Sequence, residues 1–413
     1  MVGTSEIEPK SGSAGAAGFV VSRAGGMTGT PTSGDDVAGL AGSLTGTGWS
    51  EQAAMPNMIS RLRRAILQSG LICLLTVSPG LAEEFVCFVY HRFGDDRYPS
   101  TNIAVDAFRG QLEYLRDEGF TVLTLGDALV RLDAGSLGGP TAVLTVDDGY
   151  DSFRTGALPL LQEFGMPATL FVNTNSIGRR GMLDWDDLTE LLAQGMEIGN
   201  HTATHDYFLD LPPAGRSLTF GEDVAQAQGT LTERLGQAPK LFSFPFGEYD
   251  PDMRASVERL GFAAAVAQNS GVVSSHADRF ALPRFPMGGP YATVDGFKRK
   301  ARMLALPVVA REPESPVVAG DSAPWLTLRV VREGISLRRA QCFVAGASAC
   351  SLQVEADADT ATLRVHGHEP LQGRRTLYTV TAPSTSGPGW HWFSHVWVRP
   401  RTDYGATIRK LGK

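Results

Sequence analysis

Two patterns of apolar and polar positions alternate along residues 85–267. Continuous apolar runs such as 141–146 are typical of strands buried on both faces. Between them, apolar residues recur three and four positions apart, as at Phe108, Leu112 and Leu115, which predicts helices with one buried face. Strands that alternate with helices favour parallel βαβ units, so we expect an α/β fold here. The expected strands are 85–90, 120–125, 141–146, 168–172, 196–200, 241–244 and 263–267, and the expected helices are 108–119, 127–132, 152–164, 185–194, 219–235 and 252–260.

The pattern changes after about residue 311. Residues 311–316 (Arg-Glu-Pro-Glu-Ser-Pro) are typical of a linker. Beyond them, short alternating runs are separated by turn residues, and no long helical pattern is evident. We therefore interpret residues 83–310 as the α/β domain and residues 311–413 as a small antiparallel β-sandwich, a C-terminal accessory domain. The alternating runs are 325–331, 351–355, 361–366, 376–381 and 390–398.

Length and charge narrow the classes of function. A chain of 413 residues suggests two or three domains, and 43% hydrophobic residues are enough to bury a sizeable core. The formal net charge is −7, so the composition shows no excess of basic residues that would favour binding to nucleic acid or to an anionic membrane. A neutral substrate or a polysaccharide remains open, because sugar binding needs no net charge.

The N-terminal part of the chain has the elements of a secretory signal peptide, although not at its very beginning. Residues 1–54 are rich in glycine and show no apolar periodicity, so we expect them to be disordered. Because a signal peptide normally begins a chain, we expect the true start to be Met55 or Met58. In residues 55–82, arginines precede a short apolar core and small residues that predict cleavage after Ala82. We therefore expect a secreted or periplasmic protein whose mature chain has no transmembrane span. An uncleaved signal anchor and a buried helix are the alternatives.

The four cysteines fit an oxidising compartment. Cys73 lies in the expected signal peptide and would be removed with it, and Cys87 lies in an apolar strand as an expected buried thiol. Cys342 and Cys350 are eight positions apart across a short loop, which could close as a disulfide outside the cytosol.

Two of the expected strands end in polar residues of the kinds that bind metal ions. Asp147 and Asp148 directly follow the apolar run 141–146, and His201 and His205 follow another strand. In parallel α/β folds the carboxyl ends of the strands carry ligands and chemistry. Two imidazoles four positions apart can face one ion, and together with a carboxylate they form a three-ligand set that leaves one position open for water.

These residues carry a resemblance to a known family. The string Thr145-Val-Asp147-Asp148-Gly149 resembles the T-F-D-D-G motif of the polysaccharide deacetylases, the NodB-homology or carbohydrate esterase family 4 group. The string His201-Thr-Ala-Thr-His205 is similar to their H-[ST]-x-x-H motif. Each motif alone is moderately specific, and the two in this order, each after an apolar run, are much more so. The resemblance covers about residues 86–290 and implies a distorted (β/α) barrel of about seven strands.

The resemblance also implies roles for the site residues. In the family the first Asp of the motif is the catalytic base and the second is a metal ligand. Carried over, Asp147 is the base, and Asp148, His201 and His205 hold a divalent metal ion, for which Zn²⁺ is suited and also Co²⁺ or Ni²⁺. Deacetylation needs such an ion to polarise the acetyl carbonyl and activate a water, together with a base and an acid. The plainer alternatives are a helix-capping turn for the two aspartates and a satisfied polar loop for the histidines.

The third family motif is altered in this chain. Members commonly show R-x-P-[YF], whereas Ser243 stands at the position of the arginine that orients the base. Arg284, in a Leu-Pro-Arg-Phe-Pro segment, is the candidate to replace that arginine; a surface arginine packed over an apolar wall is the alternative. Pro245, Phe246 and Gly247 are expected to bind substrate as a wall of the groove, where main-chain N–H groups could help to bind the oxyanion.

The general acid has no clear family motif. The late L-x-H motif is not clearly present, and His276 lies in a loop that does not match it. His91 ends the first strand, which is similar to a circularly permuted branch of the family that acts on poly-N-acetylglucosamine and carries its acid histidine there. We therefore expect His91 to be the acid, with a buried structural histidine as the alternative.

Together these features predict metal-dependent hydrolytic deacetylation of an acetylated polysaccharide of the N-acetylglucosamine type. An O-acetyl esterase is an alternative, because the same machinery would cleave an ester. A non-catalytic carbohydrate-binding barrel is the alternative from another class, and the altered third motif is its best support. An amidase acting on peptidoglycan peptides would need a groove fitted to peptide, and nothing in the sequence indicates one.

Overall fold

The computed structural model describes residues 83–320, 322–371 and 373–401, all of which belong to one compact unit. The stretch 1–54 and the expected signal peptide 55–82 lie outside the described residues. None of the helices within the described ranges is both long and apolar enough to cross a bilayer.

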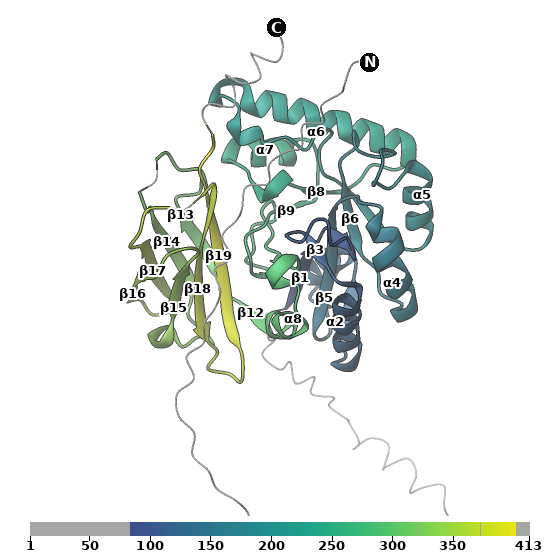
Figure 1. The fold of residues 1–413 in the computed structure, drawn as a ribbon. Helices are drawn as coiled ribbons and strands as arrows, with labels where there is room; N and C mark the ends of the chain where they lie inside the picture. Colours follow the sequence, from purple (N-terminus) through teal and green to yellow (C-terminus); the bar gives the residue numbers. More distant parts are fainter. Residues whose placement is uncertain (1–82, 321, 372, 402–413) are drawn as a thin grey trace, which may run out of the picture. The chain divides into compact units, whose positions relative to one another are not determined.

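A curled sheet of mostly parallel strands forms the first domain (Figure 1). Its strands are β1 (Glu84–Tyr90), β4 (Thr121–Leu123), β5 (Thr141–Asp148), β6 (Thr169–Val172), β7 (Glu197–Asn200), β8 (Leu241–Ser243), β9 (Ala264–Val266), β10 (Val272–Ser274) and β11 (Phe285–Pro286). The main path runs β10-β1-β5-β6-β7-β8-β9, with β11 beside β1 and β4 beside β5. All of these pairs are parallel except β1 with β10. The expected distorted α/β barrel of about seven strands is confirmed.

Helices follow the strands along the chain and pack around the sheet (Figure 1). They are α2 (Val105–Asp117), α3 (Leu125–Asp133), α4 (Leu158–Phe164), α5 (Trp185–Ala193), α6 (Pro213–Leu235), α7 (Pro251–Arg259) and α8 (Val294–Ala301). The sequence pattern predicted all of these helices except α8.

Local sequence explains where two of the helices begin. The expected helix 152–164 is α-helical only from Leu158, after a π-helical turn over Phe153–Ala157. Proline lies in the first turn of α4, where its missing N–H costs no intrahelical hydrogen bond. At α5 the side chain of Asp184 accepts from the Asp187 N–H, and the Asp187 side chain accepts from the Asp184 N–H, so the two residues form a capping box.

Strand β5 is buried along its whole length, and its alternate residues face two different cores. Val146 packs in a core that includes helix residues such as Phe108. Val143, on the other face, packs in a core that includes Phe171 of the neighbouring strand β6. Because side chains alternate along a strand, Asp147 shares the inner face of the sheet with Val143. The barrel therefore presents this carboxylate at its interior.

Two four-stranded sheets form the C-terminal domain. Their strands are β12 (Met303–Ala305), β13 (Val308–Glu312), β14 (Trp325–Val331), β15 (Gln341–Val344), β16 (Cys350–Ala356), β17 (Thr360–Gly367), β18 (Arg375–Pro383) and β19 (Trp390–Val398). The orders are β12-β19-β18-β15 and β13-β14-β17-β16, and the two sheets share one core that contains Leu328 and Trp397. The expected all-β sandwich is therefore present. Its first two strands lie within residues 303–312, so β13 runs into the stretch 311–316 that resembles a linker.

The pairing of the described cysteines agrees with the sequence-based expectation. Cys342 and Cys350 form a disulfide that joins the start of β16 to β15. Cys87, in β1, is buried and free.

The sandwich contacts the barrel along β12 and β19. The Ala305 N–H donates to the Glu84 carboxylate at 2.9 Å, which ties β12 to the start of β1. The Trp392 indole N–H donates to the Ser270 hydroxyl at 3.0 Å, and the Trp392 ring packs edge-on against Phe285. These contacts join the two domains through both polar and apolar groups.

Candidate active site

The carboxyl ends of four barrel strands bring the expected site residues together. His91 directly follows β1, Asp147 and Asp148 end β5, His201 directly follows β7, and Ser243 ends β8. Strands β1 and β5 are neighbours in the sheet, and so are β7 and β8, with only β6 between the two pairs. The same edge of the sheet therefore holds every candidate for base, metal ligand and acid.

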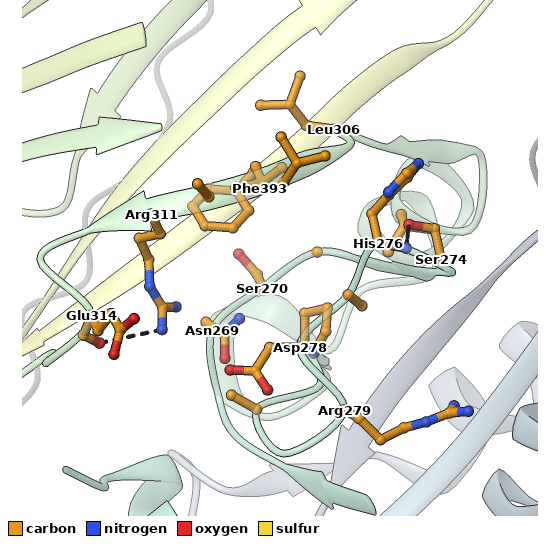
Figure 2. A pocket seen from close by; sticks show the side chains of 18 of the residues that line it. Asn269, Ser270, Ser274, His276, Asp278, Arg279, Leu306, Arg311, Glu314 and Phe393 are labelled. Atoms are coloured by element: carbon orange, nitrogen blue, oxygen red, sulfur yellow. Dashed lines mark hydrogen bonds between the residues drawn. The ribbon is translucent and has the colours of Figure 1, made fainter. Parts of the chain in front are cut away.

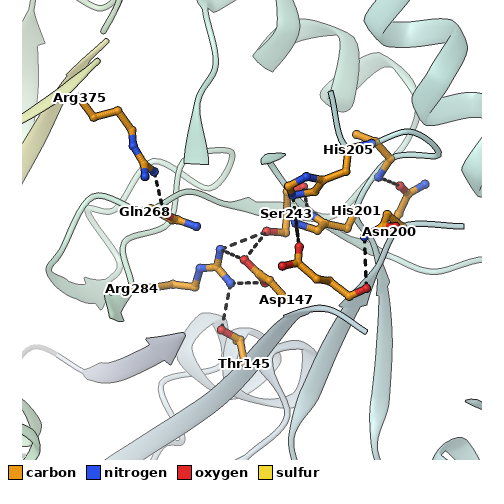
Figure 3. Close-up of polar contacts among 12 residues, drawn as sticks. Thr145, Asp147, Asn200, His201, His205, Ser243, Gln268, Arg284 and Arg375 are labelled. Atoms are coloured by element: carbon orange, nitrogen blue, oxygen red, sulfur yellow. Dashed lines mark hydrogen bonds and ion pairs between the residues drawn. The ribbon is translucent and has the colours of Figure 1, made fainter. Parts of the chain in front are cut away.

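Asp147 is held by Arg284 in a bidentate ion pair (Figure 3). Nη1 of Arg284 donates to Oδ1 at 2.7 Å and Nη2 to Oδ2 at 2.8 Å, and both side chains are 0% exposed. The remaining donors of the guanidinium are used as well: Nε to the Ala267 carbonyl at 3.0 Å, Nη1 to the Thr145 hydroxyl at 3.0 Å and Nη2 to the Ser243 hydroxyl at 3.1 Å. Ser243 in turn donates to Asp147 Oδ2 at 3.3 Å. The candidate replacement for the motif arginine thus contacts the candidate base directly.

The surroundings of Asp147 keep it ionised. Burial alone would raise the pKa of this carboxyl, but Arg284, His201 and His91 outweigh burial and hold the pKa below its ordinary value. A buried ion pair is stable only when its hydrogen bonds are well satisfied, and here every nitrogen of the guanidinium has a partner.

Asp148, His201 and His205 form a possible metal site. Their ligand atoms all lie within 4.8 Å of one another, with Asp148 Oδ1 3.4 Å from His201 Nε2 and 3.2 Å from His205 Nε2. Ligands at about 2.0–2.2 Å from a tetrahedral ion lie roughly 3.3–3.6 Å from each other, so the two separations from Asp148 are close to those around such an ion. Asp148 Oδ1 is buried, and among the described residues it has no partner in hydrogen-bond geometry. Such an atom is suited to a cation.

The hydrogen bonds and pKa values of the two histidines suit metal binding. Nδ1 of His201 lies 2.7 Å from the Ser243 carbonyl, which can only accept, so Nδ1 carries the proton and Nε2 faces Asp148. Burial and the neighbouring His201 lower the pKa of His205 to about 4, so His205 is neutral at pH 7. Burial lowers the pKa of His201, but Asp148 and Asp147 outweigh burial and raise it. A metal ion binds the neutral imidazole, so an ion at this site would compete with protonation of His201.

The loop that carries the histidines is held in an uncommon conformation. Thr202 and His205 of this loop have φ values of 71° and 58°, and Asp148 at the end of β5 has one of 76°, all in the left-handed region that residues other than glycine seldom adopt. The Asn200 side chain accepts the Thr202 N–H at 2.8 Å, and Asp223 of α6 accepts another main-chain N–H of the loop at 2.6 Å. Strained residues of this kind persist only where their surroundings hold them, and they cluster at functional sites.

His91 lies beside the cluster at the end of β1. Its charge contributes to lowering the pKa values of Asp148 and His205, which places the imidazole within electrostatic reach of both. Its role as general acid stays a prediction. Tyr150 is a further residue at this edge, and sequence reasoning missed it. Burial and the Asp148 carboxylate raise the pKa of Tyr150, and the guanidinium of Arg92 lies 3.4 Å from the centre of its ring.

The turn Pro245–Gly247 lies next to the second histidine. Phe246 has a φ of 58°, and its ring centre is 4.5 Å from that of His205 and 3.7 Å from that of Tyr207, on which it stacks. The expected wall of the groove is therefore adjacent to the cluster, while substrate binding by Pro245, Phe246 and Gly247 stays a prediction. Sequence reasoning missed Tyr207, because nothing in the motif points to it.

Two hydroxyl groups that bind Arg284 beside Asp147, those of Thr145 and Ser243, were missed, and Thr145 had a signal in the sequence. Thr145 lies two positions before Asp147 on a strand, so the two side chains must share a face. Ser243 was read as the loss of an arginine, whereas its hydroxyl accepts from Arg284 and donates to Asp147.

A cavity of about 470 Å³ lies apart from these residues (Figure 2). Strands β13 and β19 and the loops around residues 269–283 line it, with Asn269, His276 and Arg311 among its side chains and no member of the metal cluster. His276, which the motif comparison did not favour as the acid, therefore faces a different space.

Comparison with known proteins agrees with this geometry. Residues 134–265 match the family model for polysaccharide deacetylase. The chain is 26% identical over 197 residues to YxkH of Bacillus subtilis (strain 168), which is assigned to the polysaccharide deacetylases; the match covers 48% of this chain and 68% of that protein. It is 21% identical over 210 residues to the poly-beta-1,6-N-acetyl-D-glucosamine N-deacetylase of Staphylococcus aureus (strain MSSA476), covering 48% of this chain and 71% of that protein.

Among solved structures, IcaB from Ammonifex degensii is 28% identical, with a TM-score of 0.48 over 53% of this chain and 97% of that chain. The deacetylase PplD of Streptococcus pyogenes is 20% identical, with a TM-score of 0.49 over 53% of this chain and 99% of that chain. The family model covers both aspartates and both histidines of the site. The chain therefore contains a polysaccharide deacetylase domain over residues 134–265, and it is a hydrolase that acts on carbon–nitrogen bonds other than peptide bonds.

Proposed function

We propose that this protein is a metal-dependent deacetylase of a polysaccharide that contains N-acetylglucosamine. The observation that carries the proposal is the buried pair of Asp147 and Arg284 directly beside the cluster of Asp148, His201 and His205. The likeness to the staphylococcal enzyme, whose name specifies a β-1,6-linked N-acetylglucosamine polymer, supports the choice of substrate class.

Each residue has one task in this proposal. Asp148, His201 and His205 would hold a divalent ion, Zn²⁺ before Co²⁺ or Ni²⁺. When bound, such an ion would polarise the acetyl carbonyl and lower the pKa of water. Asp147 takes a proton from the attacking water as the carbon–oxygen bond forms, and its oxygens keep lone pairs for this beyond those used by Arg284.

His91 would complete the reaction as the general acid. It donates a proton to the leaving nitrogen as the carbon–nitrogen bond breaks, so that the products are acetate and a free amine on the sugar. Its place at the end of β1, beside the cluster, supports this assignment. Arg284 keeps Asp147 ionised until the water is deprotonated and keeps its carboxyl group oriented throughout.

We also propose that the protein acts outside the cytosol, in the periplasm or beyond. The signal-like stretch 55–82, the disulfide Cys342–Cys350 and an extracellular class of substrate support this location. Sequencing the N-terminus of the exported protein tests it: cleavage after Ala82 is expected, and a cytosolic, uncleaved product would contradict it.

The proposed activity is tested by acetate release from the purified chain 83–413. The substrates are N-acetylglucosamine oligomers with β-1,4 and β-1,6 linkages and an acetylated xylan, each with EDTA and with Zn²⁺ or Co²⁺ restored. Metal-dependent release from the amino-sugar oligomers is expected. Release from the xylan alone would identify an O-acetyl esterase, and no release with one equivalent of bound metal would favour a non-catalytic carbohydrate-binding barrel.

A further inference from the structure

Arg374, which directly precedes strand β18 of the sandwich, joins two buried acids of the barrel. Its Nη1 donates to Asp210 Oδ1 at 2.6 Å, its Nη2 donates to Glu248 Oε2 at 2.7 Å and its Nε donates to Glu248 Oε1 at 2.8 Å. Asp210 is 2% exposed and Glu248 3%. Two carboxylates buried this deeply need a cation, and the sandwich supplies it.

The two acids belong to two of the segments that carry residues of the site, those that follow β7 and β8. Asp210 lies five positions after His205, in the loop that follows β7. Glu248 directly follows the Pro245–Gly247 turn after β8. A single guanidinium therefore ties the loop of a metal ligand to the loop of the expected substrate wall.

The neighbouring arginine holds the turn itself. Nη1 of Arg375 donates to the Phe246 carbonyl at 2.5 Å and to Gln268 Oε1 at 3.0 Å; Figure 3 shows the latter contact. Phe246 has a left-handed backbone that only its surroundings can maintain. At Gly247 a Cβ would lie 2.5 Å from the Gln268 main chain, so the turn is seated closely on the residue that Arg375 also binds.

The contacts continue from these arginines to the metal ligand through stacked rings. Arg374 Cζ lies 4.4 Å from the centre of the Tyr207 ring, which stacks on Phe246 at 3.7 Å and an interplanar angle of 3°. The Phe246 ring contacts the imidazole of His205 with centres 4.5 Å apart. The imidazole of His205, 22% exposed, is the more accessible of the two in the cluster, so it depends more on such packing for its orientation.

We propose that Arg374 and Arg375 are positioning residues through which the C-terminal sandwich holds Phe246 against His205 and so fixes the metal cluster. The catalytic consequence rests on the proposed function, whereas the orientation of His205 can be measured through metal affinity alone. The accessory domain is then part of the construction of the site, whether or not it also binds glycan.

The test compares Arg375→Ala with Arg329→Ala, which removes an exposed arginine of β14 in the other sheet. For each folded variant of the full chain, the Kd for Zn²⁺ is measured by chelator competition, and kcat and KM are measured for acetate release. We expect Arg375→Ala to weaken Zn²⁺ binding by on the order of 10-fold and to lower kcat more than KM, as is typical when groups that orient a ligand are removed. Arg329→Ala should leave all three values unchanged.

A second variant tests the role of Arg374, the more deeply buried of the two arginines. Arg374→Lys keeps the charge but not the two-sided hydrogen bonding, and the same loss of Zn²⁺ affinity is expected. If it does not fold, Arg374→Met combined with Asp210→Asn and Glu248→Gln removes the three charges together, and lower Zn²⁺ affinity is expected there too. Wild-type Zn²⁺ affinity and kcat in folded Arg375→Ala would overturn the positioning role. If the wild-type chain binds Zn²⁺ but releases no acetate, the proposed function fails, while the affinities still decide this inference.

Discussion

The guanidinium of Arg284 donates two hydrogen bonds of 2.7 and 2.8 Å to the carboxylate of Asp147, although 137 positions separate the two residues in the chain. The family motif places an arginine directly ahead of the turn after β8, where this chain has Ser243. The cation now comes from the segment before β11 and reaches the same acid. In this chain a segment other than the third motif therefore supplies the buried positive charge in bidentate contact with Asp147.

Replacing Arg284 by Lys should preserve the charge and lose the geometry. A lysine ammonium cannot form two parallel hydrogen bonds to one carboxylate, so the base would lose its fixed orientation. We expect kcat for acetate release to fall on the order of 100-fold with a smaller change in KM. Steady-state kinetics check this, with circular dichroism to confirm folding. A folded Arg284→Lys variant with wild-type kcat would show that the bidentate contact is dispensable.

Asp147→Asn should separate catalysis from metal binding. Loss of the base should lower kcat by about 10²–10⁴-fold, while Asp148, His201 and His205 still bind one metal ion. Because the buried Arg284 would lose its partner charge, unfolding free energy should also fall by about 3–5 kcal/mol. Metal content by mass spectrometry, acetate release and urea unfolding measure the three quantities. If the variant kept a tenth or more of the activity, another group would have to be the base.

Metal binding should stabilise the chain through His205. At a free Zn²⁺ concentration 100 times its Kd, linkage predicts about 2.7 kcal/mol of added stability. His205→Ala should remove this gain, because it deletes one of the three ligands. His276→Ala, at the cavity in Figure 2, is the matched control and should keep it. Thermal unfolding with and without Zn²⁺ gives the answer, and an equal shift in both variants would place the ion elsewhere.

Glu84 should make stability depend on pH. Burial raises its pKa to about 7 from the ordinary 4.5, against the Ala305 N–H, which lowers it. Because the folded-state pKa is the higher one, the stability that this group confers is fully present below pH 4.5 and is lost as the pH rises through about 7. Between pH 5 and pH 8 we expect a loss of about 1–3 kcal/mol that a Glu84→Gln variant does not show. Urea unfolding across that range measures it, and parallel pH curves for the two proteins would exclude Glu84 as the cause.

Sequence patterns predicted the parts of the fold and site that short segments determine. The apolar run that becomes β5 leads into Asp147 and Asp148, and a strand of this kind can only deliver both acids at its carboxyl end. The positions of His201 and His205 beside Asp148 likewise follow from the short segment that carries both histidines. Strand length, burial and the spacing of polar residues are local properties, which is why a single sequence was enough for them.

Contacts between distant segments were harder to predict. Arg284 was a candidate only because the third motif lacks its arginine. The sequence around Arg284 fits an arginine on the surface equally well. Nothing near Arg374 or Arg375 in the sequence signals a barrel partner. The helix α8 and the early strands β12 and β13 were also missed, because short segments of mixed polarity gain their structure from the surfaces they cover.

The order of the sandwich strands bears on how the enzyme is assembled. Strand β12 is the first strand of the sandwich to be synthesised, yet it pairs with β19, the last. Arg374 and the main-chain N–H of Arg401, both of which bind Asp210, also belong to the final stretch of the chain. An emerging chain can thus complete most of its barrel early but not the loops around the metal cluster. The positioning role proposed for Arg374 therefore predicts that a chain truncated before β18 folds a barrel whose metal cluster is not held in place.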